Sequence, residues 1–217
     1  MAELLPVGEA ARRLGVTRNR VHQRIADGSL RAEKIGSTWL IDSAEMRPAR
    51  VSRPMSPSMV TALVQAKEGA FPHRPSERAR LKERLARIEN DPVEEVPRLV
   101  SSWLASRARG IHLEVHPQDL NLLREDARIR LSGISDPRAG LASGTEVEGY
   151  INEEDLPGLA EDLFLSLDDQ PNRPNVLLHV TDLVMEEVPK LFSAADLFDR
   201  GGPRETRAGL ALLGRVS

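Results

Sequence analysis

The chain of 217 residues contains no cysteine, which excludes disulfide bonds, thiolate metal sites and cysteine nucleophiles. Aromatic residues make up only 3% of the sequence, so a core has to be built from Leu, Val, Ile and Ala. No apolar run approaches the roughly 18 residues of a membrane span, and the residues after Met1 show no signal-peptide pattern. We therefore predict a cytoplasmic protein of one or two domains with no membrane partner.

The charge is unevenly divided along the chain. The net charge is −3, but residues 1–53 contain ten Lys or Arg and six Asp or Glu, which gives +4. Residues 144–217 contain fifteen acidic and six basic residues, which gives −9. A basic head on an acidic body predicts that only the head meets a polyanion. A charge of +4 over a segment of this length is also unremarkable, so charge alone does not decide the matter.

Two short helices are expected in the head. The first has apolar residues at helical spacing on one face, namely Val7, Ala10, Ala11 and Leu14. Gly15 is suited to end this helix, and Thr17 is a good N-cap for a second helix over residues 18–26. Two helices joined by a turn that contains glycine are the helix-turn-helix pattern.

The second helix carries polar side chains opposite its apolar face. At about 100° per residue, Val21 and Ile25 share the face that should pack on the first helix. The residues on and beside the opposite face are Arg18, Asn19, Arg20, His22, Gln23 and Arg24. Amide side chains read adenine and arginine reads guanine in the major groove, whereas flanking cations and the Thr17 region hold phosphates. The alternative is a solvated polar face on an ordinary helical hairpin.

A hairpin is expected directly after these helices. Residues 28–42 predict a strand, a tight turn at Gly36-Ser37 and a second strand. Asp42-Ser43 is suited to cap a short helix that ends at Met46. A small hairpin in this position is a wing beside the helix-turn-helix.

The head resembles a known family through an ordered set of short segments. They run from Val16 to Ile25, from Asp27 to Leu30, from Lys34 to Gly36 and from Trp39 to Ile41. Over roughly residues 4–47 the chain is similar to the excisionase and MerR-type winged helix-turn-helix. The resemblance implies that the second helix enters the major groove of double-stranded DNA and that the wing contacts the backbone or the minor groove. By resemblance, these roles fall on Arg18, Asn19, Arg20, His22, Gln23 and Arg24, and on Lys34, Ser37 and Thr38.

The wing departs from the family in one respect. Ser37-Thr38 is neutral, whereas wings of this family often carry an arginine after the glycine. We therefore expect weak wing contacts, made mainly by Lys34.

Residues 48–58 are a basic, proline-rich linker that cannot form a regular helix. Arg47, Arg50 and Arg53 are candidates to follow a phosphate backbone or to enter a minor groove, as basic arms do. A plain tether fits the same residues equally well. Ser58 is suited to cap the helix that follows.

A helical segment is expected over residues 59–110. Its helices cover residues 59–66, 78–88 and 96–109, and their apolar stripes indicate a core or a dimer seam. The second of these helices has a basic face, made by Arg78, Arg80, Lys82, Arg84 and Arg87. A solvated face is favoured there over a second DNA contact.

Residues 111–217 predict a small α+β domain. Strands are expected over residues 111–115, 128–133 and 175–181, and helices over 117–124, 193–199 and 204–213. Residues 115–131 resemble residues 151–167 at a spacing of 36 positions, and both copies predict strand, acidic short helix, strand. The similarity is weak and chance also explains it. The fold class is thus mainly α with α+β.

Motifs that carry chemistry are absent from the sequence. There is no P-loop, no G-x-S-x-G and no G-x-G-x-x-G. His112 and His116 share a strand face without a dense set of further metal ligands. Acidic clusters such as Glu153–Asp155 are explained better as helix starts than as cation sites. We predict no enzyme activity, no cofactor and no metal.

The body also resembles a family. The segments that carry this resemblance are His116–Leu120, Leu131–Ser135, Val147–Ile151, Asn175–His179 and Ala194–Leu197 with Gly202–Arg204. They are similar to bacterial regulators with an antitoxin-like body, of the abortive-infection type, whose partners are nucleotidyltransferase-like toxins. The resemblance implies a sequestering or autoregulatory role in which the acidic body faces a partner protein. The excisionase-like head departs from that group.

The sequence therefore predicts a DNA-binding transcriptional regulator, with a winged helix-turn-helix over residues 1–47 and a body over 111–217 for dimerisation or partner binding. It would be nucleoid-associated, and it would form a homodimer because one small head buries too little surface for tight specific binding. One alternative is an excisionase-like factor that bends DNA, although such factors are little more than the head. Another is a protein whose head is a scaffold that does not bind DNA.

Overall fold

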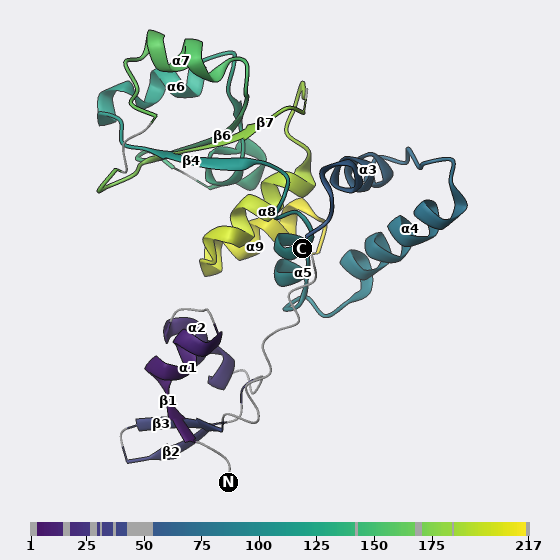
Figure 1. The fold of residues 1–217 in the computed structure, drawn as a ribbon, viewed down its shortest axis with the longest axis vertical. Helices are drawn as coiled ribbons and strands as arrows, with labels where there is room; N and C mark the ends of the chain where they lie inside the picture. Colours follow the sequence, from purple (N-terminus) through teal and green to yellow (C-terminus); the bar gives the residue numbers. More distant parts are fainter. Residues whose placement is uncertain are drawn as a thin grey trace. The chain divides into compact units, whose positions relative to one another are not determined.

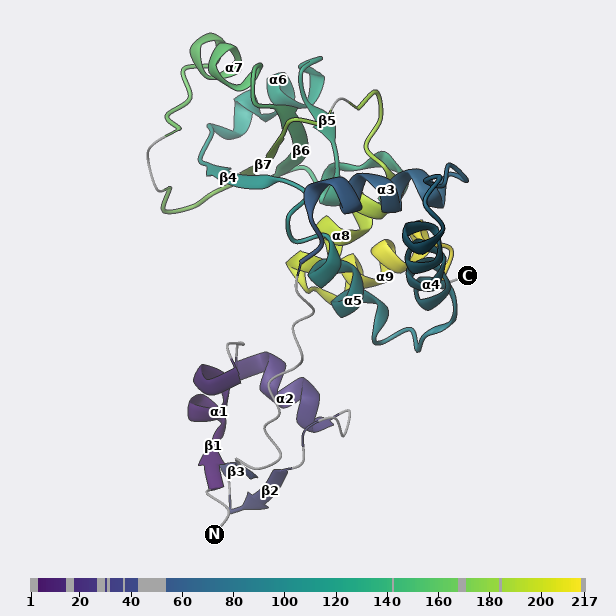
Figure 2. The same ribbon diagram turned by 45° about the vertical axis from the view of Figure 1, so that its right-hand side comes forward.

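The computed structural model describes residues 4–14, 18–26, 30, 32–36, 38–42, 54–141, 143–167, 171–183 and 185–215. The chain divides into two compact units, Met1–Val51 and Ser52–Ser217, and each is described by itself. Both units combine α-helices with a β-sheet (Figure 1 and Figure 2). The mixed α and α+β class predicted from the sequence is thus present. No helix of the described residues is long and apolar enough to cross a membrane.

The first unit contains a three-stranded antiparallel sheet and two helices. The elements are β1 (Leu4–Pro6), α1 (Val7–Leu14), α2 (Arg18–Ala26), β2 (Ala32–Ile35) and β3 (Thr38–Asp42), and the strand order is β1-β3-β2. Ile35 pairs with Thr38 at the end of the hairpin, and Gly36 has a φ of 63°, which glycine adopts without strain. The predicted helices 7–14 and 18–26 are confirmed.

A small apolar core holds the first unit together. Its buried members are Ala10, Ala11, Val21, Leu30 and Ile41. The predicted inner faces of both helices are confirmed, because Val7, Leu14 and Ile25 also pack against this core. Strand β1 was not expected, since three residues are too few to show a period; it is held by pairing along β3. The predicted helix after Asp42 lies outside the described residues.

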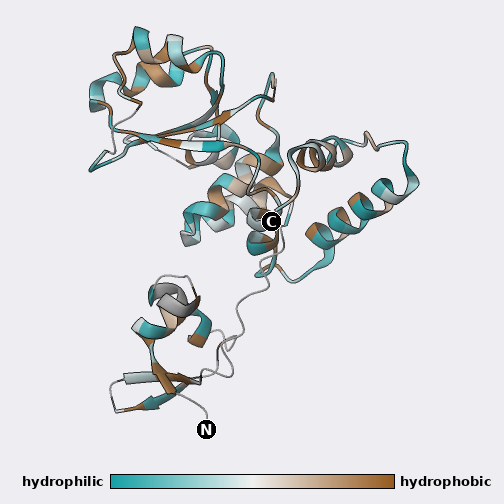
Figure 3. Cartoon of the chain, viewed as in Figure 1, coloured by the Kyte–Doolittle hydropathy of each residue, from teal (hydrophilic) through white to brown (hydrophobic). Residues whose placement is uncertain are grey.

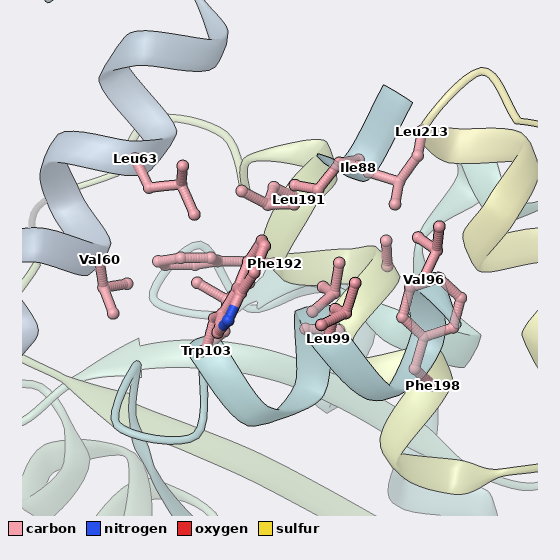
Figure 4. Packing of buried hydrophobic residues seen from close by; sticks show 14 of the residues in the cluster. Val60, Leu63, Ile88, Val96, Leu99, Trp103, Leu191, Phe192, Phe198 and Leu213 are labelled. Carbon is pink, nitrogen blue, oxygen red and sulfur yellow. The ribbon is translucent and has the colours of Figure 1, made fainter. Parts of the chain in front are cut away.

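The second unit begins with a helical layer. It contains α3 (Pro57–Lys67), α4 (Pro75–Asn90), α5 (Val96–Trp103), α8 (Lys190–Arg200) and α9 (Pro203–Leu212). Val60 and Leu63 from α3 point toward Phe192 of α8 and Trp103 of α5 (Figure 4). The predicted stripes on α4 and α5 therefore form core together with the C-terminal helices, so the middle of the chain shares one core with its end.

A four-stranded sheet completes the second unit. Its strands are β4 (Arg109–Leu113), β5 (Arg130–Leu131), β6 (Val147–Asn152) and β7 (Val176–Thr181), in the order β4-β7-β6-β5. β6 and β7 run parallel, and the other pairs are antiparallel. The short helices are η1 (Pro117–Asp119), α6 (Leu120–Glu125), η2 (Gly133–Ser135), η3 (Pro137–Ala139) and α7 (Leu156–Asp162).

The sheet has one apolar and one polar face. Alternate residues Val176, Leu178 and Val180 of β7 join a core with α6 and α7, which lie together over that face in Figure 1. The intervening residues of β6 and β7 face the other way and include Glu148 and His179, both buried. The hydropathy view shows hydrophobic and hydrophilic residues side by side in these elements (Figure 3).

Several boundaries in the second unit differ from the sequence prediction, and three of them have a local cause. Ser56 caps α3 in place of Ser58, because Pro57 fits the first helical position and the helix starts earlier. The helix predicted over 96–109 ends at Trp103, where the chain turns and Arg107 enters a buried ion pair before β4 starts. The strand predicted over 128–133 shortens to β5 because Gly133, with a φ of 53°, turns the chain into η2.

The predicted repeat is only partly realised. In each copy a short helix, α6 or α7, follows a strand, β4 or β6, although β4 ends at Leu113, before the first copy begins. The second copy was expected to end in a strand at residues 165–167, but these described residues form none. Both edges of β6 are already occupied, by β5 and β7, which leaves no place beside it for another strand.

Candidate nucleic-acid interface and a buried polar cluster

The side chains of α2 divide between core and solvent. Val21 is fully buried, whereas Arg18, His22 and Gln23 are exposed and Arg24 is half-buried. Asn19 and Arg20 lie on the same helix. The exposed residues are polar or basic and follow one another within two turns. This is an outward surface with hydrogen-bond donors and acceptors and no large apolar side chain among the described ones.

Three of the predicted contact residues line a common hollow in the first unit. Its volume is about 580 Å³, and its walls include Arg18 and His22 from α2, and Thr38 and Trp39 from β3. The start of α1 completes the wall. A guanidinium, an imidazole and a hydroxyl around one hollow suit an anion rich in oxygen. Glu9 also lines this hollow, so one carboxylate works against anion binding there.

Gly8 makes room for Arg18 at this hollow. A Cβ atom added at Gly8 would lie 3.3 Å from Nη2 of Arg18. The guanidinium therefore passes directly over the first turn of α1. A small residue at this point lets a side chain of α2 lie along α1 and turn toward the hollow.

The hairpin presents a second cation. Lys34 is exposed on β2, and its Nζ atom lies 5.8 Å from the centre of the Trp39 ring across the strand pair. An ammonium group near an aromatic face is attracted by the ring quadrupole, which restricts the lysine to one side of the hairpin. Thr38 is also exposed. Five further predicted residues lie outside the described part of the chain, namely Thr17, Ser37, Arg47, Arg50 and Arg53.

The basic face predicted on α4 lies against aromatic rings. Arg84 and Arg87 lie 5.6 Å and 5.5 Å from the ring centre of the buried Trp103. Arg78 and Lys82 approach the ring of Phe71 in the same way. The pKa of Arg84 is lowered by burial and by the neighbouring arginines. These cations therefore cover the edge of the helical core, and α4 is otherwise mostly hydrophilic (Figure 3).

A buried polar cluster in the body was missed by the sequence reasoning. Its centre is Asp196 of α8, whose Oδ1 accepts hydrogen bonds from Nε of Arg107 at 2.9 Å, from Nη2 of Arg107 at 2.5 Å and from the hydroxyl of Tyr150 at 3.1 Å. The Arg107 and Asp196 side chains are 5% and 0% exposed. The cluster therefore joins the turn after α5, strand β6 and helix α8 away from water.

His179 extends this cluster toward the surface. Its Nε2 lies 3.0 Å from Oε1 of Glu148 and 3.5 Å from Oδ1 of Asp196, and its ring stacks on Tyr150 at 4.8 Å. Nε of Arg200 donates to Oε2 of Glu148 at 2.9 Å. A pocket of about 420 Å³ opens beside these groups, and His112 of β4 lines it as well. His116 was expected on the same strand face as His112, but it lies beyond β4 and caps η1.

A third buried carboxylate is paired in the same region. Asp136 is held by Arg138, whose Nη2 donates at 2.8 Å, and by the Ser193 hydroxyl, which donates at 2.5 Å. The hydroxyl of Ser132 donates to Oδ2 of Asp196, so the Asp136 group and the Asp196 group lie side by side. In the described part of the chain, every buried side-chain nitrogen and oxygen has a hydrogen-bond partner.

The surroundings set the protonation of these groups. Burial would raise the pKa of Glu148, but His179 and Arg200 outweigh it and hold the pKa below its ordinary value. Arg138 and Ser193 likewise overcome burial and lower the pKa of Asp136. Burial and the nearby Asp196 raise the pKa of Tyr150. Glu148 and Asp136 are thus charged and the phenol of Tyr150 is neutral at neutral pH.

Glu148, His179 and Asp196 offer metal-ligand atoms that all lie within 4.8 Å of one another. Both carboxylates already accept hydrogen bonds from arginines, and those guanidinium groups compete with a cation for the same oxygens. Three buried carboxylates face three arginines, Arg107, Arg138 and Arg200. The arrangement is best described as an ion-paired network that fixes α8 on the polar face of the sheet.

A faint sequence signal for this cluster exists in retrospect. Glu148 and Tyr150 alternate with the apolar residues of β6, and Ser193 and Asp196 are one helical turn apart on α8. Polar residues at the inner positions of a strand and a helix that are otherwise apolar indicate a buried network. The partner Arg107 lies too far along the chain for spacing to identify it.

Comparison with known proteins gives one short match. No known family and no solved structure matches the chain. A stretch of 43 residues, 20% of the chain, is 51% identical to a probable plasmid-partitioning protein ParA of Thermus thermophilus. The matched stretch covers 13% of that protein. The chain thus shares a short segment with a much longer protein, and this match does not place it in a family.

Proposed function

We propose that the chain is a sequence-specific transcriptional regulator whose first unit is a winged helix-turn-helix that binds double-stranded DNA. The observation that carries the proposal is the hollow of the first unit. Arg18 and His22 of α2 meet Thr38 of the hairpin there, so the predicted recognition helix and the predicted wing contribute to one surface. The resemblance to excisionase and MerR-type heads supports the same conclusion.

In this proposal α2 lies in the major groove. Gln23 is exposed and carries an amide, which pairs with the two hydrogen-bonding atoms of adenine in that groove. Arg18 and Lys34 hold phosphates on either side and fix the register without reading sequence. The wing contributes Lys34 and Thr38 and no arginine among its described residues.

The proposed assembly is a homodimer in the cytoplasm, associated with the nucleoid. A specific protein–DNA interface buries roughly 1,000–2,500 Å² of protein surface, which is large for a unit of this size. Two copies on two half-sites supply that area and double the number of bases read.

The finer role that we propose is an antitoxin that represses its own operon and binds a partner protein through its acidic body. This role depends on the resemblance of the body to abortive-infection antitoxins. An excisionase-like bending factor is the alternative. The matched protein is named for plasmid partitioning, a process on a DNA molecule, but the match covers too little of it to transfer an activity.

Fluorescence polarisation tests the DNA-binding proposal. The full chain is titrated into the DNA upstream of its own gene and into a scrambled duplex of equal length, between 50 and 200 mM salt. We expect the upstream DNA to bind about a thousandfold tighter, and affinity to fall steeply with salt, by roughly 0.9 logarithmic units per contacted phosphate. Equal affinity for both duplexes would refute sequence-specific regulation.

A further inference from the structure

Phe164 is an unusual residue on the surface of the body. Its side chain is 95% exposed, more than any other large hydrophobic residue that the structure describes. It follows α7, one of the two helices that cover the apolar face of the sheet (Figure 1). Transfer of an aromatic ring from water into a protein core is strongly favourable. The exposed ring of Phe164 therefore does not contribute the stabilisation that a buried aromatic ring provides.

The backbone at Phe164 carries a second cost. Its φ is 52°, and it is the one residue other than glycine with a positive φ among those described. The N–H of Leu165 donates to the carbonyl of Ala160 at 2.8 Å, which closes α7 in the manner usually completed by glycine. A side chain in this left-handed region is disfavoured. Glycine would relieve both costs, so stability does not explain the phenylalanine.

The sequence around Phe164 is rich in acidic residues. Residues 139–172 contain nine Asp or Glu and no Lys or Arg. Arginines from other parts of the fold pair with four of these acids: Arg200 with Glu146 and Glu148, Arg109 with Glu153, and Arg128 with Asp162. Glu154 lies just before α7 and Glu161 lies in its last turn, and both are exposed. A single exposed aromatic ring in a field of negative charge resembles the anchor of an interface, in which one buried aromatic residue supplies much of the binding energy. The surrounding charge then selects the partner.

We propose that Phe164 is the anchor of a docking surface for a protein that presents a basic surface with an apolar pocket. The exposed acidic residues disfavour other occupants. DNA and anionic lipid surfaces are repelled by the acidic segment, and a second copy docked symmetrically on this face would bring like charges together. The inference rests on the part of the proposed function that gives the body a protein partner.

Site-specific photocross-linking identifies the partner. The full chain carrying p-benzoylphenylalanine at position 164 is expressed in its own host and irradiated. The exposed Ala79 of α4 serves as the control position. We expect one protein with a basic surface to be cross-linked from position 164 and not from position 79. Cross-linking of a second copy alone, of no protein, or of the same proteins from both positions would overturn the proposal.

The identified protein is then purified and titrated with variants of the full chain. Phe164→Gly is compatible with the left-handed backbone, so its melting temperature is expected to equal or exceed that of the unaltered chain. Its affinity for the partner should nevertheless fall at least roughly tenfold. The double variant Glu154→Lys, Glu161→Lys should also bind the partner more weakly, and the loss of affinity should be larger at low salt than at high salt. Unchanged affinity of Phe164→Gly would refute the anchor role.

The same variant separates this inference from the proposed function. Phe164→Gly should bind the upstream DNA as tightly as the unaltered chain does. If neither protein binds that DNA specifically, the regulator proposal fails, whereas the docking surface still stands or falls on the partner titration alone.

Discussion

Arg107 and Arg109 are two positions apart and form ion pairs in opposite environments. Arg107 is almost fully buried against Asp196, whereas Arg109 pairs with Glu153 at 2.8 Å with both side chains more than half exposed. Removal of one partner from a buried ion pair leaves an uncompensated charge in the protein interior, where water cannot solvate it. At the surface, water solvates the remaining charge, so the loss of a partner costs little. The two arginines therefore form a matched pair for testing the buried cluster.

We predict that Arg107→Met lowers the free energy of unfolding by about 3–5 kcal/mol, because Asp196 loses its main donor. Arg109→Met should lower it by no more than about 1 kcal/mol. Denaturant titration of both variants measures the difference. Equal losses would show that the buried network contributes no more than a surface pair.

The buried carboxylates predict a sensitivity to acid. The pKa values of Glu148 and Asp136 are lowered from their ordinary values of 4.5 and 3.8. A lowered pKa means that the folded state binds the proton less readily than the unfolded chain, so the stabilisation is complete above those ordinary values and is lost as the pH falls through the folded ones. Unfolding free energies measured from pH 6 to pH 3 should therefore decline, and Glu148→Gln should decline less steeply. A flat profile would contradict this account.

Two exposed residues of the first unit predict different losses of DNA binding. Gln23→Ala should weaken binding to the upstream DNA much more than to scrambled DNA, since a base contact contributes about 1–3 kcal/mol of discrimination. Lys34→Ala should weaken binding to both duplexes equally. It should also reduce the dependence of affinity on salt by the amount expected for about one phosphate contact. Polarisation titrations give all four affinities. A uniform loss for Gln23→Ala would remove it from the reading surface.

At the residue scale, sequence reasoning found candidates on helix faces and missed those in the tertiary network. Gln23 and His22 follow from angular spacing alone, and both are exposed as expected. Arg107 and Asp196 are 89 positions apart, and only the folded sheet and α8 bring them together. Composition gives no signal for such a pair, because the free energy that orients it comes from long-range packing.

At the scale of elements, Gly149 of β6 shows how the absence of a side chain lets a neighbouring strand lie close. A Cβ atom at Gly149 would lie 2.7 Å from Cγ2 of Ile129 and 2.9 Å from the carbonyl oxygen of Arg130. Gly149 pairs directly with Leu131 of β5. The short edge strand can therefore lie against β6 only if this position carries no side chain.

We predict that Gly149→Ala destabilises the body by about 1–3 kcal/mol, because β5 has to move outward. Gly144→Ala is the control, since no atom lies within 4 Å of its added Cβ and its φ is not positive. It should change the free energy of unfolding by less than about 0.5 kcal/mol. Similar losses in both variants would show that crowding at β5 is unimportant.

Helices with strong periodicity could be predicted, whereas the shortest strands could be predicted only in part. The residues of α1 and α2 were predicted because apolar spacing, caps and glycine agreed. The strand predicted over 128–133 is present but is reduced to the two residues of β5, and β1, with three residues, is too short to show alternation. The end of α5 was misplaced because the ion pair of Arg107 overrides the helical preference of the residues before it.

At the scale of the whole molecule, the chain has a small unit and a larger one. The first unit has a core of few, mostly small residues, whereas the second combines a helical layer and a sheet around two larger cores. The sequence indicated a basic head and an acidic body through charge alone. It did not indicate that residues 57–103 share a core with α8 and α9, because contacts between distant helices leave no local pattern.

The lack of cysteine allows a direct test of where α2 lies on DNA. A single cysteine introduced as His22→Cys leaves the proposed base contact of Gln23 intact and is the only attachment point for a DNA-cleaving iron chelate. Ala79→Cys provides the matched control on α4. We predict strand cleavage inside the bound upstream site from position 22, centred on a major groove, and none above background from position 79. Absence of cleavage from position 22 at saturating protein, or cleavage from position 79 alone, would contradict the assignment of α2 as the recognition helix.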